Sequence, residues 1–212
     1  SAGIAVRDEA SGKISIVKAK GRLKILSEKT DNGRAVRGTC GIGHTRWATH
    51  GEPSETNAHP HCTDDRSVVL VHNGIIENYL PLKEHLIRRG VNFVSETDTE
   101  VVAQLLEYYY KGDDLDAVIQ VLRHVEGSYA LGVICQDYPD QLVAVRKDSP
   151  LIVGVGSGEN YIASDVPAIL ERTRDIYRLN DQEIAVLCRG SVSFYNMDKE
   201  PVQKELCHVD WD

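Results

Sequence analysis

Residues 128–135, SYALGVIC, open the part of the chain that decides the fold. β-Branched and aromatic residues favour strands. Further short segments of this kind follow, separated by turns, at 141–146, 151–155, 161–163, 176–179, 183–188 and 192–195. One predicted helix, around residues 166–172, interrupts the series. Because connections this short leave no room for crossover helices, we predict antiparallel strands.

Upstream of residue 128 the chain reads as strands followed by helices. We predict strands at 3–7, 14–19, 41–49 and 67–72, the first two forming a hairpin, with a loop over 51–65. Helical spacing of apolar residues predicts helices over 20–30, 76–89, from Thr97 onward and over 113–124. Thr97 and Glu100 form a capping box. The order strands, helices, strands predicts an α+β fold in which helices cover two antiparallel sheets.

The composition is that of a globular protein with an acidic surface. The chain has 212 residues, of which 42% are hydrophobic and 26% charged, and we expect one large domain. The formal net charge of −8 would repel phosphate backbones, so we expect no nucleic-acid partner. The longest purely apolar run, Val68–Val71, is far shorter than the ~20 residues that span a bilayer. With no secretory signal in view either, we expect no membrane partner.

The cysteines indicate free thiols in a reducing cytoplasm. There are five, an odd number, and no two are close in sequence, which fits neither a disulfide framework nor a zinc ribbon. His59-Pro60-His61-Cys62 invites a metal hypothesis. The proline between the histidines matches no zinc-finger or zincin spacing, so we expect no metal.

Three positions could carry chemistry, and each has a structural alternative. Arg46, at the end of a predicted strand, suits a bidentate pair with a ligand carboxylate, or equally an internal aspartate. Asn73-Gly74 could form an oxyanion hole, although the dipeptide alone favours a turn. Asp98, one residue after the helix cap, could hold an ammonium group; taken alone, it more simply complements the helix dipole.

Four motifs in order resemble one family: HTRWATHGEP at 44–53, NAHPH at 57–61, VHNGIIEN at 71–78 and SETDTE at 95–100. They are similar to the glutaminase domain of glucosamine-6-phosphate synthases, the glutamine:fructose-6-phosphate amidotransferases, which are class II glutamine amidotransferases. The resemblance continues at 127–130, 149–151 and 158–165 and covers essentially the whole chain, 1–212.

The resemblance implies a four-layer αββα sandwich of the N-terminal-nucleophile hydrolase type. It implies that Arg46 holds the α-carboxylate of glutamine and Asp98 its α-ammonium, and that Asn73 and Gly74 supply the oxyanion hole. The loop that closes over glutamine would be shaped by Trp47, Thr49 and His50. A free amino acid presents one carboxylate and one ammonium, and amide hydrolysis creates an oxyanion, so these residue types suit the task.

By the same resemblance, the intact domain hydrolyses L-glutamine to glutamate. A second, sugar isomerase domain uses the ammonia to convert fructose 6-phosphate to glucosamine 6-phosphate. No cofactor is implied, and we expect a cytoplasmic homo-oligomer when the protein is full-length.

One departure concerns the nucleophile, which in the family is an N-terminal cysteine in a Cys-Gly-Ile opening. Ser1-Ala2-Gly3 resembles the stretch that follows the family's first strand and helix, so we expect this chain to lack those elements, the nucleophile and the isomerase domain. Cys40-Gly41-Ile42 mimics the opening but leads into Arg46, which indicates a buried strand thiol. Two alternatives remain: a module that binds glutamine without catalysis, and a structural thiol-rich or metal-binding domain.

Overall fold

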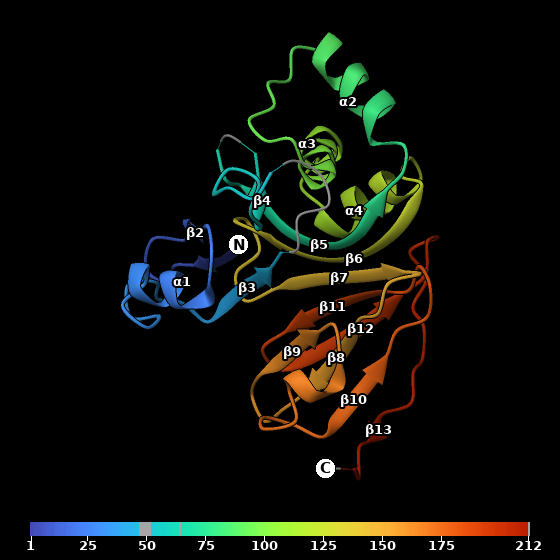
Figure 1. Ribbon diagram of the computed structural model, residues 1–212. Coiled ribbons are helices and arrows are strands. Elements are labelled where there is room, and N and C mark those ends of the chain that lie inside the picture. The colour runs from blue at the N-terminus through green and yellow to red at the C-terminus, as the bar shows by residue number, and fades with distance from the viewer. Residues whose placement is uncertain (47–51, 64, 212) are drawn as a thin grey trace.

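The computed structural model describes residues 1–46, 52–63 and 65–211, which form four stacked layers (Figure 1). The α-helices are α1 (Leu23–Lys29), α2 (Tyr79–Arg88), α3 (Asp98–Tyr109) and α4 (Asp114–Leu122), with one 3₁₀ turn, η1 (Val166–Ala168). The strands are β1 (Ala2–Arg7), β2 (Ile14–Ala19), β3 (Cys40–Thr45), β4 (His61–Cys62), β5 (Val68–Ile76), β6 (Gly127–Cys135), β7 (Leu142–Lys147), β8 (Ile152–Val155), β9 (Asn160–Ala163), β10 (Asp175–Arg178), β11 (Ile184–Cys188), β12 (Ser191–Tyr195) and β13 (Cys207–His208).

A six-stranded sheet of order β12-β11-β7-β6-β5-β4 is the centre of the molecule. All its neighbouring strands are antiparallel, and β5 and β6 pair along their full length, from Val68 opposite Cys135 to Ile76 opposite Gly127. Apolar side chains point to both faces of these two strands: Leu70 packs toward the helices, whereas Val69 packs toward the other strands. Both faces of the sheet are therefore buried between layers.

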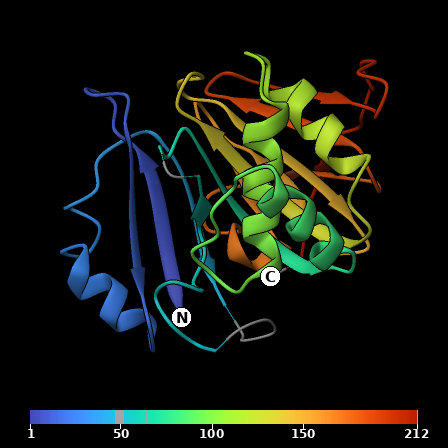
Figure 2. The same ribbon diagram turned by 90° about the horizontal axis from the view of Figure 1, so that it is seen from above.

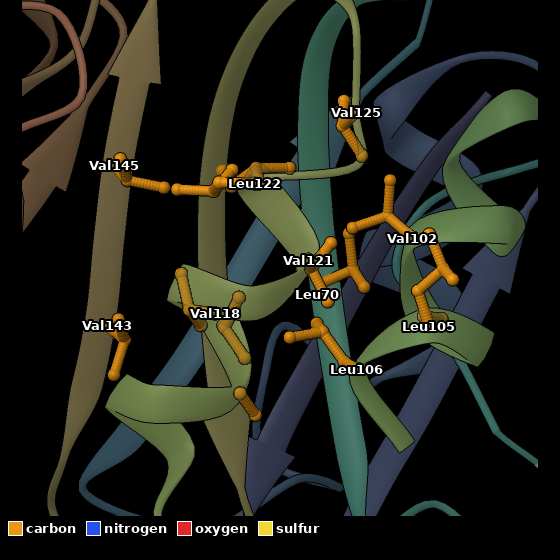
Figure 3. Packing of buried hydrophobic residues seen from close by; sticks show 14 of the residues in the cluster. Leu70, Val102, Leu105, Leu106, Val118, Val121, Leu122, Val125, Val143 and Val145 are labelled. Atoms are coloured by element: carbon orange, nitrogen blue, oxygen red, sulfur yellow. The ribbon is translucent and has the colours of Figure 1, made fainter. Parts of the chain in front are cut away.

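Helices α3 and α4 cover one face of this sheet, with α2 beyond α3 (Figures 1 and 2). Apolar residues spaced three and four apart on α3 and α4 meet residues from β5 and β7 (Figure 3). The labelled contacts are Leu70, Val102, Leu105, Leu106, Val118, Val121, Leu122, Val125, Val143 and Val145. Burial of each such side chain contributes about 1.5–3 kcal/mol, so this packing fixes α3 on the sheet.

The opposite face is covered by a second strand layer, which consists of two sheets. One has the order β2-β1-β3 and the other the order β13-β10-β8-β9. Ala5, Ile42 and Val153 from this layer pack with Val71 and Ala144 of the central sheet. Helix α1 packs on the outer face of the first sheet through Leu26, and η1 packs beside the second through Val166. The expected αββα sandwich of antiparallel sheets is thereby confirmed, with its second strand layer divided.

Most strand and helix predictions match the observed elements within a few residues. The turn favoured for Asn73-Gly74 is wrong, because β5 continues through both residues in its ladder with β6. Two short strands were not predicted: β4, which lies in the expected loop 51–65, and β13. The helix expected at 166–172 is only the turn η1.

The predicted N-terminus of α3 is confirmed, with a changed capping pattern. Thr97 accepts a hydrogen bond from the N–H of Glu100 through its hydroxyl. The Glu100 carboxylate, which is buried, accepts the N–H groups of Val94 (3.0 Å) and Ser95 (2.6 Å). The capping glutamate therefore holds the chain just before the helix, which also fixes where α3 begins.

Among the described residues, no helix is both long and apolar enough to cross a membrane.

Asp114 at the start of α4 makes stability depend on pH. Burial raises the pKa of its carboxyl to about 6, from 3.8. Above pH 6 the group is ionised in both folded and unfolded chains, so folding must bury a charge; below pH 4 it is protonated in both. We expect Asp114→Asn to raise the free energy of unfolding at pH 8 by about 1–3 kcal/mol, and this gain to vanish below pH 4. Urea unfolding at several pH values measures it.

Asp116→Asn is the matched control, because Asp116 lies in the same first turn of α4 but is only half-buried. It should not stabilise the chain at pH 8, since it loses a favourable helix-dipole interaction without relieving a buried charge. Equal effects of the two substitutions at every pH would show that the Asp114 carboxyl carries no burial cost.

Candidate functional site

The end of β5 places Asn73 and Gly74 at the surface of the central sheet. Both are exposed, although they remain within the ladder, opposite Ala130 and Tyr129. Gly74 has φ +116°, and a Cβ there would lie 2.4 Å from the carbonyl oxygen of Ser128. Only glycine fits this position, so the backbone next to the Asn73 side chain has a shape that other residues would disrupt.

Asp98 lies at the same edge, as the first residue of α3. Its side chain is only 4% exposed, and its Oδ2 accepts the N–H of Ile76 at 2.8 Å. The bond ties the start of α3 to the end of β5, three residues beyond Asn73. The helix N-terminus also stabilises the negative charge. Asp98 is therefore a buried, fixed carboxylate beside the Asn73-Gly74 segment.

Arg46 follows β3 and brings a positive charge to the same region. Its backbone N–H donates to the Ser1 carbonyl at 2.8 Å, which extends the ladder between β1 and β3 by one residue. Burial lowers the pKa of its guanidinium, and the Asp98 carboxylate acts in the opposite direction. Arg46 and Asp98 therefore lie close enough for their charges to interact.

Behind these residues lies a cluster of histidines and threonines that links the strands to α3. His59 Nε2 and His72 Nδ1 both lie 2.9 Å from the Thr99 hydroxyl, and His61 Nε2 lies 3.0 Å from the Thr97 hydroxyl. All five side chains are buried. Thr97 caps α3 and Thr99 lies in its first turn, so the cluster flanks Asp98 on both sides.

The loop that carries two of these histidines is held firmly in place. Asn57 donates to the Glu52 carbonyl and accepts the N–H of Glu96, both at 2.9 Å, so the loop is tied to the start of α3. The His59 carbonyl passes so close to β1 that a Cβ on Gly3 would lie 1.8 Å from it. Glycine at position 3 is therefore required for the loop to reach the site.

Two histidines of this cluster, His59 and His61, are held in the neutral form by burial. Burial lowers the pKa of His59 well below its usual range, and the neighbouring His44 adds to the effect. Burial likewise lowers the pKa of His61 well below its usual range and lowers that of His44. Uncharged imidazoles leave Arg46 and Asp98 to set the charge of the site.

Two hollows follow one another along the divided strand layer. The first, of about 460 Å³, contains Asn73 and His44 and lies between Gly43–Thr45 of β3 and Ile162–Ala163 of β9. The second, of about 610 Å³, lies between Cys40–Gly41 and Asn160–Tyr161 of the same two strands. In the part of the chain that the structure describes, β3 pairs only with β1 and β9 only with β8. We call this double hollow between β3 and β9 the trough.

None of the cysteines lies beside Arg46, Asn73 and Asp98. Cys40 begins β3, six residues and about 20 Å before Arg46, and burial raises the pKa of its thiol to about 11. The others lie on β4, at the ends of β6 and β11, and on β13, and all five are free. Over residues 1–46, 52–63 and 65–211, no group of three or more His, Cys, Asp or Glu side chains is arranged to hold a metal ion.

The structure therefore brings together Arg46, Asn73, Gly74 and Asp98, four of the residues that the sequence predicted. The three residues expected in the closing loop, Trp47, Thr49 and His50, lie outside the described residues. The supporting roles of His44, His59, His72 and Thr99 were missed. One signal was available, since five of the eight histidines lie between His44 and His72.

Comparisons with known proteins identify relatives of the chain. Residues 44–171 match the model of a family described as "Glutamine amidotransferase domain". The glutamine–fructose-6-phosphate aminotransferase (isomerizing) of Caldanaerobacter subterraneus subsp. tengcongensis is 58% identical over 212 residues, and that of one Thermus thermophilus strain is 50% identical over 211. Each match covers 100% of this chain and 34% of the relative, so the chain spans about a third of the length of these relatives.

Solved structures show the same fold. The glutamine phosphoribosylpyrophosphate amidotransferase of B. subtilis has a TM-score of 0.77 at 24% identity, over 94% of this chain and 43% of that one. A structure described as the allosteric regulatory enzyme of purine biosynthesis also has a TM-score of 0.77, at 25% identity, over 92% of this chain and 42% of that one. With the family model matching more than half of its residues, the chain belongs to the glutamine amidotransferase domain family.

Proposed function

We propose that the site binds L-glutamine and hydrolyses its side-chain amide. The observation that carries the proposal is the meeting of Arg46, Asp98 and Asn73 at one edge of the central sheet. A guanidinium and a buried carboxylate match the α-carboxylate and α-ammonium of a free amino acid. Oδ2 of Asp98 accepts a hydrogen bond from the Ile76 N–H, and Oδ1 would receive the ammonium.

The Asn73-Gly74 segment suits the chemical step. Attack on the amide carbon moves an electron pair onto the amide oxygen, so hydrogen-bond donors must face that oxygen in the transition state. The side-chain amide of Asn73 and the backbone N–H of Gly74 are such donors. When the oxyanion collapses, the C–N bond breaks and the nitrogen takes up the proton lost by the thiol, so ammonia leaves and a γ-glutamyl thioester remains. Water then cleaves the thioester, which releases glutamate and returns a proton to the thiolate.

A thiol nucleophile must come from outside the residues gathered at the site, and the trough supports a place for it. The trough is lined by residues along both facing strands, from Cys40 to Thr45 on β3 and from Asn160 to Ala163 on β9. Apolar residues of the central sheet, such as Val71 and Leu142, also line it. An extended segment laid there could hydrogen-bond to both strands and join the two sheets into one. We propose that a strand carrying the family's N-terminal cysteine occupies the trough, with the cysteine at the end near Asn73.

In a longer protein like the named relatives, the released ammonia would serve a second domain that converts fructose 6-phosphate to glucosamine 6-phosphate. The relatives' name, glutamine–fructose-6-phosphate aminotransferase, supports this reaction. We further propose a cytoplasmic homo-oligomer that needs no cofactor. The five free cysteines fit a reducing compartment, and the net charge of −8 fits a protein without nucleic-acid partners.

A second candidate function is glutamine binding without catalysis. The position of the cysteines favours it for residues 1–212 by themselves, because the ligand grips are present while every cysteine lies elsewhere. Both candidate functions require glutamine binding, and only the first includes hydrolysis. Binding and activity therefore need to be measured separately.

Arg46→Lys tests whether Arg46 binds the α-carboxylate of glutamine. Lysine keeps the positive charge and loses the planar fork that bonds a carboxylate twice. We expect the affinity for glutamine in the intact protein to fall by roughly 10–100-fold, with the melting temperature unchanged. Titration calorimetry measures the affinity. Arg37→Lys, at an exposed position, is the control and should bind normally. Normal glutamine affinity in the Arg46 variant would reject the carboxylate role.

Asn73→Ala tests the oxyanion donor. Since the donor acts mainly in the transition state, kcat should fall by about 10²–10³ while KM stays within a few-fold. Steady-state release of glutamate measures both. If the variant loses thermal stability but keeps its turnover, Asn73 stabilises β5 and takes no part in catalysis.

Comparing two lengths of chain tests the nucleophile. Residues 1–212 expressed alone should release no glutamate from glutamine, because no thiolate lies at the site. They should also melt at a lower temperature than a chain extended by the cysteine-bearing segment, because the edges of β3 and β9 stay unpaired. Equal turnover by the two proteins would place the nucleophile among residues 1–212.

A further inference from the structure

A short hydrogen bond connects the two strand layers at the site. His44 Nε2, on β3, lies 2.6 Å from Asn73 Oδ1, on β5. Both residues line the smaller hollow of the trough, and His44 is two residues before Arg46. Asn73, the proposed oxyanion donor, is therefore held by a side chain of β3, the strand that leads directly into Arg46.

The proton in this bond belongs to His44. An amide oxygen only accepts hydrogen bonds, so Nε2 must carry the hydrogen. The other ring nitrogen, Nδ1, is buried and meets no partner with hydrogen-bond geometry among the described residues, although the backbone of His72 lies near the ring. Placing the hydrogen on Nδ1 would bury an unsatisfied donor and turn the lone pair of Nε2 toward the lone pairs of the Asn73 oxygen. The neutral tautomer with hydrogen on Nε2 avoids both costs.

The neighbouring ring of His59 also carries its hydrogen on Nε2. His72 Nε2 lies 3.4 Å from the carbonyl of Ser128 and donates to it, so its Nδ1 accepts the hydroxyl hydrogen of Thr99. That hydroxyl has no second hydrogen, and it must accept from His59 Nε2. The Nδ1 of His59 then carries no hydrogen, and it is likewise buried without a hydrogen-bond partner among the described residues.

The rings of His44 and His59 pack with their centroids 4.1 Å apart. A second proton on either ring would bury a charge beside the other ring and near Arg46, and neither Nδ1 has a hydrogen-bond partner within the described residues. Packing and hydrogen bonding together thus hold His44 as a neutral ring that donates from Nε2 alone.

We propose that His44 is a positioning residue for amide hydrolysis, which keeps the Asn73 carboxamide turned so that its N–H₂ group faces the substrate oxygen. The proposal rests on the proposed function. Oxygen and nitrogen of a carboxamide exchange places on a half-turn of the side chain, and the reversed amide would present lone pairs to the oxyanion. By engaging Oδ1, His44 leaves Nδ2 as the end that is free to face the hollow.

Kinetics of His44→Phe and His44→Gln in the intact protein test the role. Phenylalanine fills the space of the ring without a donor, so kcat should fall at least ~10-fold with KM within about threefold. Glutamine offers an N–H₂ donor and should recover most of kcat. In the Asn73→Ala background, His44→Phe should change kcat by less than about twofold, because the group it orients is gone.

His61→Phe is the matched control, since its buried ring bonds Thr97 and not Asn73. Its effect on kcat should be the same in both backgrounds. The proposal is overturned if His44→Phe lowers kcat equally with and without Asn73, if it changes KM alone, or if it leaves both constants unchanged. Any of these outcomes would leave His44 as packing between the layers.

Nitrogen-15 NMR of the histidine rings tests the hydrogen bond without relying on activity. The spectrum should show His44 as a neutral ring with hydrogen on Nε2, and in Asn73→Ala this hydrogen should exchange faster with water. The proposal is overturned if the hydrogen lies on Nδ1, or if its exchange rate is the same in the wild type and in Asn73→Ala. Absence of turnover in the intact wild-type protein would reject the proposed function instead, and the NMR result would still decide whether His44 fixes the Asn73 amide.

Discussion

The site depends on the hydrogen bond from the Ile76 N–H to the Asp98 carboxylate. It joins the end of β5 to the start of α3 and thereby sets how far Asp98 stands from Asn73 and Gly74. A carboxylate that is 4% exposed needs compensation for lost hydration, and the Ile76 N–H, the helix N-terminus and the nearby guanidinium of Arg46 supply it. The same three features hold the Asp98 carboxylate in a fixed position, where it can receive an ammonium group.

The second constraint is the approach of β3 to the central sheet. This strand carries His44 and Arg46, and the bond from His44 to Asn73 fixes its end against β5. Around that point burial disfavours the charged forms of His44, His59 and His61, so the site presents the positive group of Arg46 and the negative group of Asp98. That balance suits a zwitterionic amino acid better than a phosphate or a dicarboxylate, either of which would leave a charge unmatched.

The sequence predicted those features that depend on local pattern. Apolar spacing located α3 and α4, and β-branched segments located β6 to β12, because such patterns record which face is buried. The resemblance to glutaminase domains selected Arg46, Asn73, Gly74 and Asp98, and the structure places them together. Taken without the resemblance, Asn73-Gly74 favoured a turn, and it lies in a strand because pairing with β6 outweighs the local preference of the dipeptide.

What the sequence could not predict depends on contacts between distant residues. The histidines join β3, the 52–63 loop, β5 and α3. Nothing in their spacing shows that His59 and His72 share the Thr99 hydroxyl, or that the rings of His44 and His59 pack together. The division of the second strand layer is equally hidden, since β3 and β9 look like ordinary strands. Residues 47–51, where a closing loop was predicted, lie outside the described residues.

A crystal structure of the intact protein with glutamine bound tests the central claim most directly. The α-carboxylate should pair with the Arg46 guanidinium and the α-ammonium should lie on Oδ1 of Asp98. The side-chain amide oxygen should lie about 3 Å from both Asn73 Nδ2 and the Gly74 N–H. Glutamine bound with its amide directed away from Asn73, or held without Arg46 and Asp98, would contradict the account.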